Sequence, residues 1–131
     1  GVAALALSDA LEEAGYSVSI SLFSCSDGIG EGGESAAVAM KVKDAGEPLA
    51  LGALSSLTAH GASFRTLAFA AKLHLAASVS SGLGCPVPVT QEHLEAFGFA
   101  EGALIMPKAY SREDALKAIT SVTEKFLAQA A

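Results

Sequence analysis

The stretch YSVSISLFSCSDGIGEGGESAAVAMKVK, residues 16–43, decides the fold of this chain. Apolar residues alternate with serines in its first part and with alanine and lysines in its last part, and this period of two predicts two strands. The glycine-rich residues 24–34 between them predict a turn without regular structure. We therefore expect an antiparallel hairpin with one apolar face, which helices must cover. The alternating apolar positions are Val18, Ile20, Leu22, Val38, Met40 and Val42.

The hairpin is expected to lie at the edge of a sheet. The alternation places Lys41 and Lys43 together on the polar face of the second strand. Lysines commonly protect an exposed strand edge from pairing with another chain. The glycine-rich residues 28–33 are then its tip.

Apolar residues spaced three and four apart predict helices over residues 2–14, 49–59, 64–76 and 91–97, and a last helix that begins after Ser111. The last helix opens with a capping box, in which the Ser111 hydroxyl and the Asp114 carboxylate each accept a backbone N–H of the other residue. Its expected apolar face consists of Leu116, Ile119, Val122, Thr123, Phe126 and Leu127. The other helix ends are expected at residues suited to capping, which are Gly15, Gly61, Ser63, Thr90 and Gly98.

A third strand is predicted over residues 103–106, a wholly apolar run that Pro107 stops. Such a run is typical of a buried parallel strand. The resulting order of helices and strands predicts a single α/β domain over residues 1–131. Its layers are expected to be helix, mixed sheet and helix, with the hairpin at one edge.

Composition restricts the classes of function. With 131 residues, of which 51% are apolar, the chain is expected to form one globular domain. The net charge of −6 and only eight scattered Lys and Arg residues argue against nucleic-acid binding. We expect no membrane span, because no apolar run approaches about 20 residues. Without a signal-peptide pattern at its start, the chain is expected in the cytoplasm with Cys25 and Cys85 as reduced thiols, and a single disulfide between them is the alternative.

Two pieces of the chain resemble von Willebrand factor A-type domains. Residues 4–16, followed directly by a strand, resemble the first helix and second strand of that fold, and the hairpin resembles its antiparallel edge strand. Residues 42–49 and 59–65 are similar to uncharacterised A-domain-like proteins of actinobacterial phages. The resemblance implies A-domain or Rossmann-like layering and a role in protein binding.

The metal-site motif of A-type domains, Asp-x-Ser-x-Ser after a first central strand, does not occur in this sequence. Ser24-Cys25-Ser26-Asp27 differs from it and follows the wrong strand. No metal ligand is therefore carried over. The resemblance implies a metal-independent member of the family, or a chain that lacks the first central strand.

Residues 28–33, GIGEGG, fit the pattern G-x-G-x-x-G after a strand. A dinucleotide site also requires a helix that opens at the glycines and an acidic residue about 20 positions later. A second strand is expected to follow instead, and position 53 is Ala53. A mobile hairpin loop is the alternative that the sequence favours.

Other candidate groups are each matched by a structural alternative. Asp27, Glu31 and Glu34 could bind calcium weakly, or form a solvated acidic loop. Cys85 and His93 could form a nucleophile and its base, although structural roles are favoured. The remaining histidines stand singly and are expected at the surface or at helix ends, and they are His60 and His74.

The best candidate site is a rim at the ends of two strands. Ligands of open α/β sheets gather at the carboxyl ends of parallel strands. Polar residues follow the strand at 17–23 and the strand at 103–106, and both groups share one rim if these strands are parallel. An ordinary polar turn is the alternative. The rim residues are Ser24, Ser26, Asp27, Lys108 and Tyr110, with Arg112 nearby.

These observations predict a non-catalytic module for protein–protein interaction or assembly, which uses no cofactor and binds a protein partner or its own copies. The low share of charged residues, 17%, favours association, because it leaves apolar patches on the surface. The alternative is a small nucleotide-binding protein or enzyme that uses the loop at 28–33 and the rim at Lys108.

Overall fold

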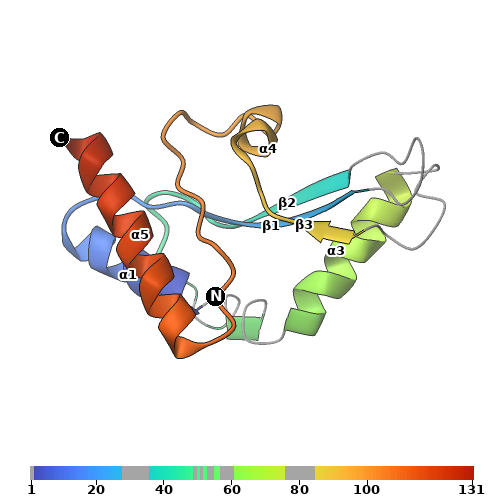
Figure 1. Ribbon diagram of the computed structural model, residues 1–131, viewed down its shortest axis with the longest axis horizontal. Helices are drawn as coiled ribbons and strands as arrows, with labels where there is room; N and C mark the ends of the chain where they lie inside the picture. The colour runs from blue at the N-terminus through green and yellow to red at the C-terminus, as the bar shows by residue number, and fades with distance from the viewer. Residues whose placement is uncertain are drawn as a thin grey trace. The chain divides into compact units, whose positions relative to one another are not determined.

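A computed structural model describes residues 2–27, 36–48, 50, 52, 55–56, 61–75 and 85–131 of the chain (Figure 1). Over these ranges the backbone forms four helices and three strands. They belong to two compact units. The central unit is Ser19–Val89, and the terminal unit combines Gly1–Val18 with Thr90–Ala131. Within the described ranges, no helix is both long and apolar enough to span a membrane.

The sheet of the central unit has three strands in the order β2-β1-β3. β1 (Ile20–Asp27) pairs antiparallel with both β2 (Ala36–Lys43) and β3 (Cys85–Val87). The predicted antiparallel pair is therefore confirmed, and β2 lies at an edge as expected. The expected turn begins too early, because residues 24–27 belong to β1. Its backbone is paired on both sides there, with β2 and with β3, and this pairing outweighs the weak strand preference of Ser and Asp. The tip at 28–33 lies outside the described residues.

A bulge changes the faces of the two lysines in β2. Ser21 pairs with Lys41, but Ile20 pairs with Lys43, so the register shifts by one residue between these pairs. An extra residue in one strand interrupts the alternation of side chains. Lys41 consequently remains exposed while Lys43 is buried at 3% exposure. The expectation that both lysines share a solvent-facing side is wrong for this reason.

Helix α3 (Gly61–Leu75) packs against β2 within the central unit. It begins at Gly61, so Ser63 lies inside its first turn and is not its N-cap as expected. Ala68 and Lys72, one turn apart, are its buried residues, whereas Leu67, which the apolar spacing of residues 64–76 places on the same side as Ala68, is exposed. Of the helix expected over 49–59, the described residues Gly52, Ser55 and Ser56 are helical and Ala50 is not, and the other positions lie outside the described part of the chain.

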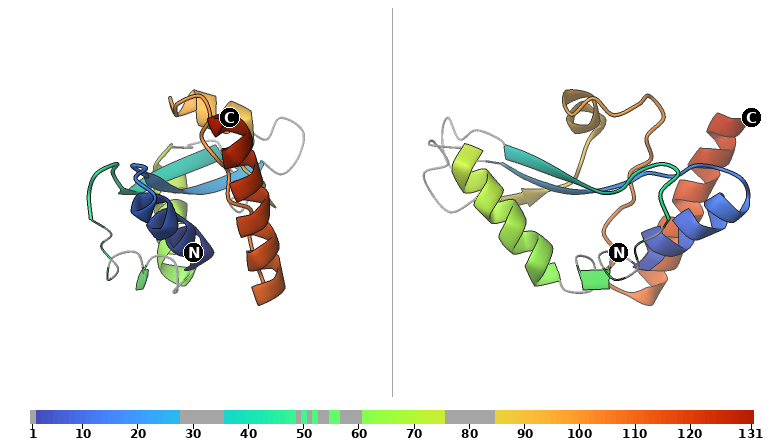
Figure 2. Two further views of the ribbon diagram at one scale, coloured as in Figure 1. Left: turned by 90° about the vertical axis from the view of Figure 1, so that its left-hand side faces the viewer. Right: turned by 180° about the vertical axis from the view of Figure 1, so that it is seen from behind.

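In the terminal unit, α1 (Val2–Glu13) packs against α5 (Arg112–Ala130), and Figure 2 shows the two helices from two further directions. α1 ends as the sequence predicts. Gly15 has φ +93°, and its N–H donates to the Glu12 carbonyl while the N–H of Tyr16 donates to the Leu11 carbonyl, both at 3.0 Å. This pair of bonds is the Schellman motif, which satisfies the last carbonyls of a helix. The core-facing side of α1 is centred on Ser8, and Ala6 and Ala14, which the apolar spacing of residues 2–14 includes in a core-facing stripe, are exposed.

α4 (Gln91–Ala96) follows Thr90 and ends in the same motif at Gly98, as expected. The predicted strand at 103–106 is absent, since these half-buried residues have no regular structure. A short apolar run indicates burial but does not by itself distinguish a strand from other buried structure. Among the described strands the sheet is therefore antiparallel, and they form no mixed sheet. What stands is a chain of helices with a small antiparallel sheet.

The cap of α5 is confirmed in its first half and shifted in its second. The Asp114 N–H donates to Ser111 Oγ at 3.0 Å, as predicted. The Asp114 carboxylate accepts the N–H of Tyr110 at 3.3 Å instead of that of Ser111. α5 turns Ala118 and Val122 inward, so its buried face includes the predicted Val122 but is shifted around the helix toward Ala118.

Phe126 of α5 is half-buried and meets the ring of Tyr16 edge to face, with centroids 4.9 Å apart. Two residues of the predicted apolar face point away from the core. Leu116 is 57% exposed and Leu127 is 60% exposed. The apolar spacing therefore describes two sides of α5, one packed and one exposed.

Candidate functional site

A buried lysine joins two serines in the central unit. Lys72 Nζ lies 3.0 Å from Ser24 Oγ and 2.9 Å from Ser26 Oγ. The alternation of β1 puts both serines on one face of the sheet. α3 covers that face and places Lys72 over them, at 1% exposure. We call these three residues the lysine–serine cluster.

The geometry of the lysine–serine cluster is compatible with two chemical roles for Lys72. As an ammonium, Lys72 donates hydrogen bonds to both hydroxyls, which compensate part of the cost of its burial and tie α3 to β1. As an uncharged amine, its nitrogen is within reach to accept the proton of a serine, which is how a base activates a nucleophile. The distances from Lys72 Nζ to the two serine oxygens are compatible with either role.

The cluster contains two of the predicted rim residues, Ser24 and Ser26, but for a different reason than expected. They meet because they are two apart on β1. Lys72 is not among the predicted site residues, and the signal for it in the sequence is its place one turn after Ala68 on an otherwise apolar side of α3. Asp27 is the last residue of β1, and its side chain lies outside the described part of the chain.

The other predicted rim residues, Lys108 and Tyr110, are exposed residues of the terminal unit. The rim required parallel strands ending beside both groups. Since residues 103–106 form no strand and the described strands pair antiparallel, that requirement is not met. Lys108 and Tyr110 instead line an open hollow of about 420 Å³, together with Pro107, Asp114, Lys117, Ala118 and Ser121.

His93 has a structural role at the start of α4. Its Nδ1 accepts the N–H of Thr90 at 3.0 Å and lies 2.9 Å from Thr90 Oγ1. His74 is exposed in the last turn of α3. Across the described ranges, no three His, Cys, Asp or Glu side chains are placed to hold a metal ion. The candidates that lie outside the description are His60, Glu31, Glu34, the side chain of Cys85 and the glycines at 28–33.

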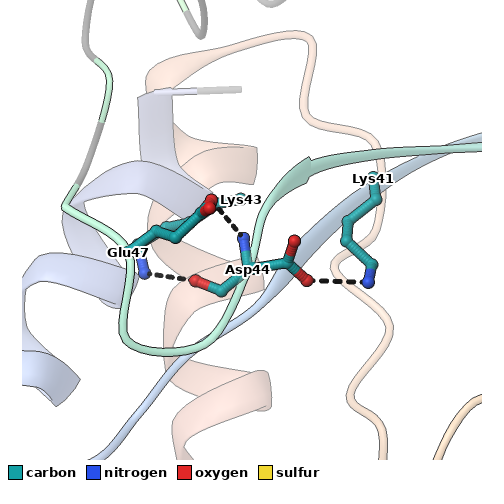
Figure 3. A network of polar contacts seen from close by, with 4 residues as sticks. All are labelled: Lys41, Lys43, Asp44 and Glu47. Atoms are coloured by element: carbon teal, nitrogen blue, oxygen red, sulfur yellow. Dashed lines mark hydrogen bonds and ion pairs between the residues drawn. The ribbon is translucent and has the colours of Figure 1, made fainter.

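A polar network closes the turn after β2 (Figure 3). Lys41 Nζ lies 2.7 Å from Asp44 Oδ1, and Lys43 Nζ donates to the Asp44 carbonyl at 3.2 Å. Glu47 accepts the Asp44 N–H at 3.3 Å and donates its own N–H to the Asp44 carbonyl at 3.2 Å. The hydrogen bond to Asp44, and then its charge, raises the pKa of Lys41. The side chains of Lys41, Lys43 and Glu47 all contact Asp44 within the turn, so the network has a structural role.

Several large apolar side chains are exposed on the helices and at their ends. Leu116 and Leu127 lie on α5, and Leu67 and Leu73 lie on α3. Exposed leucines are unremarkable singly, but several on one helix indicate a surface for association. The others are Tyr16, Phe97 and Tyr110.

Over residues 1–130 the chain matches a protein family described as a domain of unknown function, DUF7192. The chain belongs to this family. No curated protein and no solved structure matches it. The family description assigns no activity.

Proposed function

We propose that this chain is a non-catalytic module for protein–protein interaction or assembly. The observation that carries the proposal is the exposure of Leu116 and Leu127 on α5, a helix that already packs its other side within the terminal unit. Interface centres are poor in charged residues and rich in apolar ones. A helix with a second apolar side has the composition that such a centre requires.

The resemblance to A-type domains implies the same class of function. We also propose that the chain is related to these domains and shares their layered fold. The described strands pair antiparallel, so the proposal is supported by the exposed leucines and not by that layering. The binding partner in this proposal is either another protein or a second copy of the chain. The proposal requires no cofactor.

The interaction proposal is tested by replacing Leu116 and Leu127 with Ser together. We expect wild-type protein to associate, with itself in light scattering or with a protein captured from its source cells, and the double variant to lose that association. Circular dichroism should show unchanged helix content. The matched control is Ala70→Ser on the exposed side of α3, which should associate like wild type. A wild-type chain that stays monomeric and captures nothing dependent on the two leucines would refute the proposal.

The lysine–serine cluster favours a second candidate, a small enzyme that transfers acyl groups. Ser24 Oγ would attack a carbonyl carbon, its proton would pass to the uncharged Lys72 amine, and that proton would leave with the departing alcohol or amine. Water would then hydrolyse the acyl-serine. Ser24 is half-buried and therefore more accessible than Ser26, which is 5% exposed.

A fluorophosphonate probe distinguishes this second candidate from the first. An active Ser24 displaces fluoride and adds one phosphonyl group, which intact-mass measurement detects. Labelling should disappear in Ser24→Ala and in Lys72→Met, and persist in the exposed control Ser121→Ala. Absence of labelling in the wild type removes the enzyme candidate and leaves the interaction proposal intact.

The nucleotide-binding alternative, with the loop at 28–33 and Lys108, is tested by thermal shift. A nucleotide at 100 times its dissociation constant would add about 2.7 kcal/mol to the free energy of unfolding. The interaction proposal expects no shift with any nucleotide.

A further inference from the structure

We propose that α5 pairs with the α5 of a second copy of this chain, antiparallel and about a twofold axis. This inference rests on the proposed function and names its partner. It begins with the geometry of the exposed side of α5.

Leu116 and Leu127 are eleven residues apart, which on an α-helix is three turns within about 20° of the same direction. Along the axis they are roughly 16 Å apart. Thr120, which is exposed, and Thr123, which is half-buried, lie between them in the same direction. We call these four residues the outer stripe. Ala118 and Val122 point to the other side of α5 and are buried, so the outer stripe is separate from the packed face.

In the antiparallel arrangement, Leu116 of each copy lies beside Leu127 of the other copy. Thr120 then lies beside Thr123 of the second copy, because these positions are also symmetric about the middle of the stripe. Each leucine, more than half exposed in the single chain, becomes covered by its counterpart. Covering these side chains supplies the apolar burial that favours association.

Charge complementarity selects this arrangement. Lys117 and Glu124 lie on the same side of the outer stripe, because seven residues are close to two helical turns. A twofold axis perpendicular to both helices brings that side of one copy against the same side of the other. Lys117 then faces Glu124 of the second copy with an offset of about 3 Å along the axis, and the pair occurs twice.

A parallel arrangement, with the twofold axis along the helices, would instead place the Lys117 and Glu124 side of each copy beside the opposite flank of the other copy, which carries Ile119 and Phe126. Neither charged residue would then lie beside a residue of opposite charge, so the charges favour the antiparallel arrangement. Within each chain, Lys117 Nζ already lies 2.7 Å from Glu113 Oε1, with both side chains exposed. Exposed ion pairs of this kind exchange partners at little cost, so Lys117 can contact both carboxylates.

The two helices contribute a small interface. Complexes at the low end of buried area associate weakly and reversibly. We therefore expect sedimentation to show a mass that rises from one chain toward two as the concentration increases through the micromolar range. The outer-stripe variant Leu116→Ser/Leu127→Ser should remain a single chain at every concentration.

The decisive experiment reverses one charge at a time. Lys117→Glu alone, or Glu124→Lys alone, places two like-charged pairs across the axis and should weaken dimerisation at least tenfold. Mixing the two variants restores both pairs, since one copy then carries two acidic and the other two basic residues at these positions. We expect the mixture to dimerise with near wild-type affinity. The matched control is Lys125→Glu on α5, whose position points about 160° away from the middle of the stripe and should leave dimerisation unchanged.

A wild-type chain that stays monomeric overturns the inference, as does a mixture that remains monomeric. Single variants that dimerise like wild type overturn the antiparallel register. If the chain is monomeric but binds a different protein through Leu116 and Leu127, the proposed function stands and only this inference fails. If the two leucines are needed for neither, both fail.

Discussion

Lys72 shows how one side chain can define a site. An ammonium at 1% exposure is stable only with hydrogen-bond partners, and Ser24 and Ser26 supply two of them. Replacing Lys72 with Met keeps the length of the side chain but leaves two hydroxyls without this donor. We expect Lys72→Met to lower the free energy of unfolding by about 1–3 kcal/mol in urea denaturation.

The triple variant Lys72→Met/Ser24→Ala/Ser26→Ala separates the hydrogen bonds from the packing. Replacing a polar group together with its partners by apolar groups of similar shape is often nearly neutral. The triple variant should therefore be more stable than Lys72→Met alone. Equal or lower stability would mean that the cluster contributes mainly through the packing of the serines and the lysine stem.

Ser8, unlike Lys72, is a buried polar residue whose side chain lacks a hydrogen-bond partner among the described residues. Its side chain is buried at 2% exposure on α1, and its Oγ has no hydrogen-bond partner in the part of the chain that the structure describes. We expect Ser8→Ala to raise the free energy of unfolding by about 1 kcal/mol, because it removes an unsatisfied hydroxyl. Ser121→Ala, on the exposed side of α5, is the control for helix propensity alone. A loss of stability in Ser8→Ala would show that the hydroxyl has a favourable contact.

At the scale of elements, α5 separates the strength of a cap from that of a packed ring. The bond from the Asp114 N–H to Ser111 Oγ is an exposed N-cap, so Ser111→Ala should cost about 1 kcal/mol. Phe126→Ala removes a half-buried ring and its edge-to-face contact with Tyr16, and should cost more, about 2–3 kcal/mol. Thermal and urea unfolding of the two variants give the ranking. The reverse order would mean that the ring contributes little to holding α5 against the N-terminal segment.

The edge strand β2 has one exposed lysine and one buried lysine, and they should respond differently. Lys41 is exposed at the edge and paired with Asp44, so Lys41→Val should promote aggregation, measured by light scattering on heating. Lys41→Gln keeps a polar edge and should aggregate less. Because the pKa of Lys41 is raised, the stabilisation from its pairing is fully present below pH 10.5 and is lost as the pH rises through the raised value. A Lys41→Val variant as soluble as wild type would argue that another part of the chain protects the edge.

The elements also show which features a sequence can predict. The ends of α1 and α4 at Gly15 and Gly98 were predictable, because a left-handed residue after a helix is a local requirement. The bulge beside Ile20 and the extension of β1 through Asp27 depend on pairing with distant strands. The apolar run at 103–106 predicted burial but not its form. Local sequence patterns therefore predict the ends of helices better than the ends of strands or the faces on which strand residues lie.

For the whole molecule, the candidate site was predicted in part. The sequence predicts Ser24 and Ser26 as polar residues at the end of a strand, yet their contact with Lys72 spans more than 45 positions of sequence. No local sequence pattern predicts such a contact, because the contact depends on how α3 lies on the sheet. The expected rim joined residues of two units through a parallel strand that does not form.

The two units differ in what they bury, and this difference predicts how they open. Among the described residues, the terminal unit buries Leu94, Ala118 and Val122, and Ser8 is its only buried polar residue. In the central unit the buried polar residues outnumber the apolar ones, which are Cys25 and Ala68. Apolar burial is the main favourable term in folding, and segments with little of it open at lower free energy. We therefore expect backbone amides of β1 to exchange with solvent faster than those on the packed side of α5.

Val122→Ala tests whether the two units open independently. The substitution removes two methyl groups at 4% exposure and should increase exchange along α5 and α1, which pack together. Amides of β1 and β2 should keep their wild-type exchange rates, since both strands pair with strands of the central unit. Hydrogen exchange followed by mass spectrometry measures both regions in one sample, and Ala68→Gly in α3 provides the reciprocal change in the central unit. Equal acceleration in both regions by either variant would show that the chain opens as one cooperative body, so that the division into two units describes contact density and not stability.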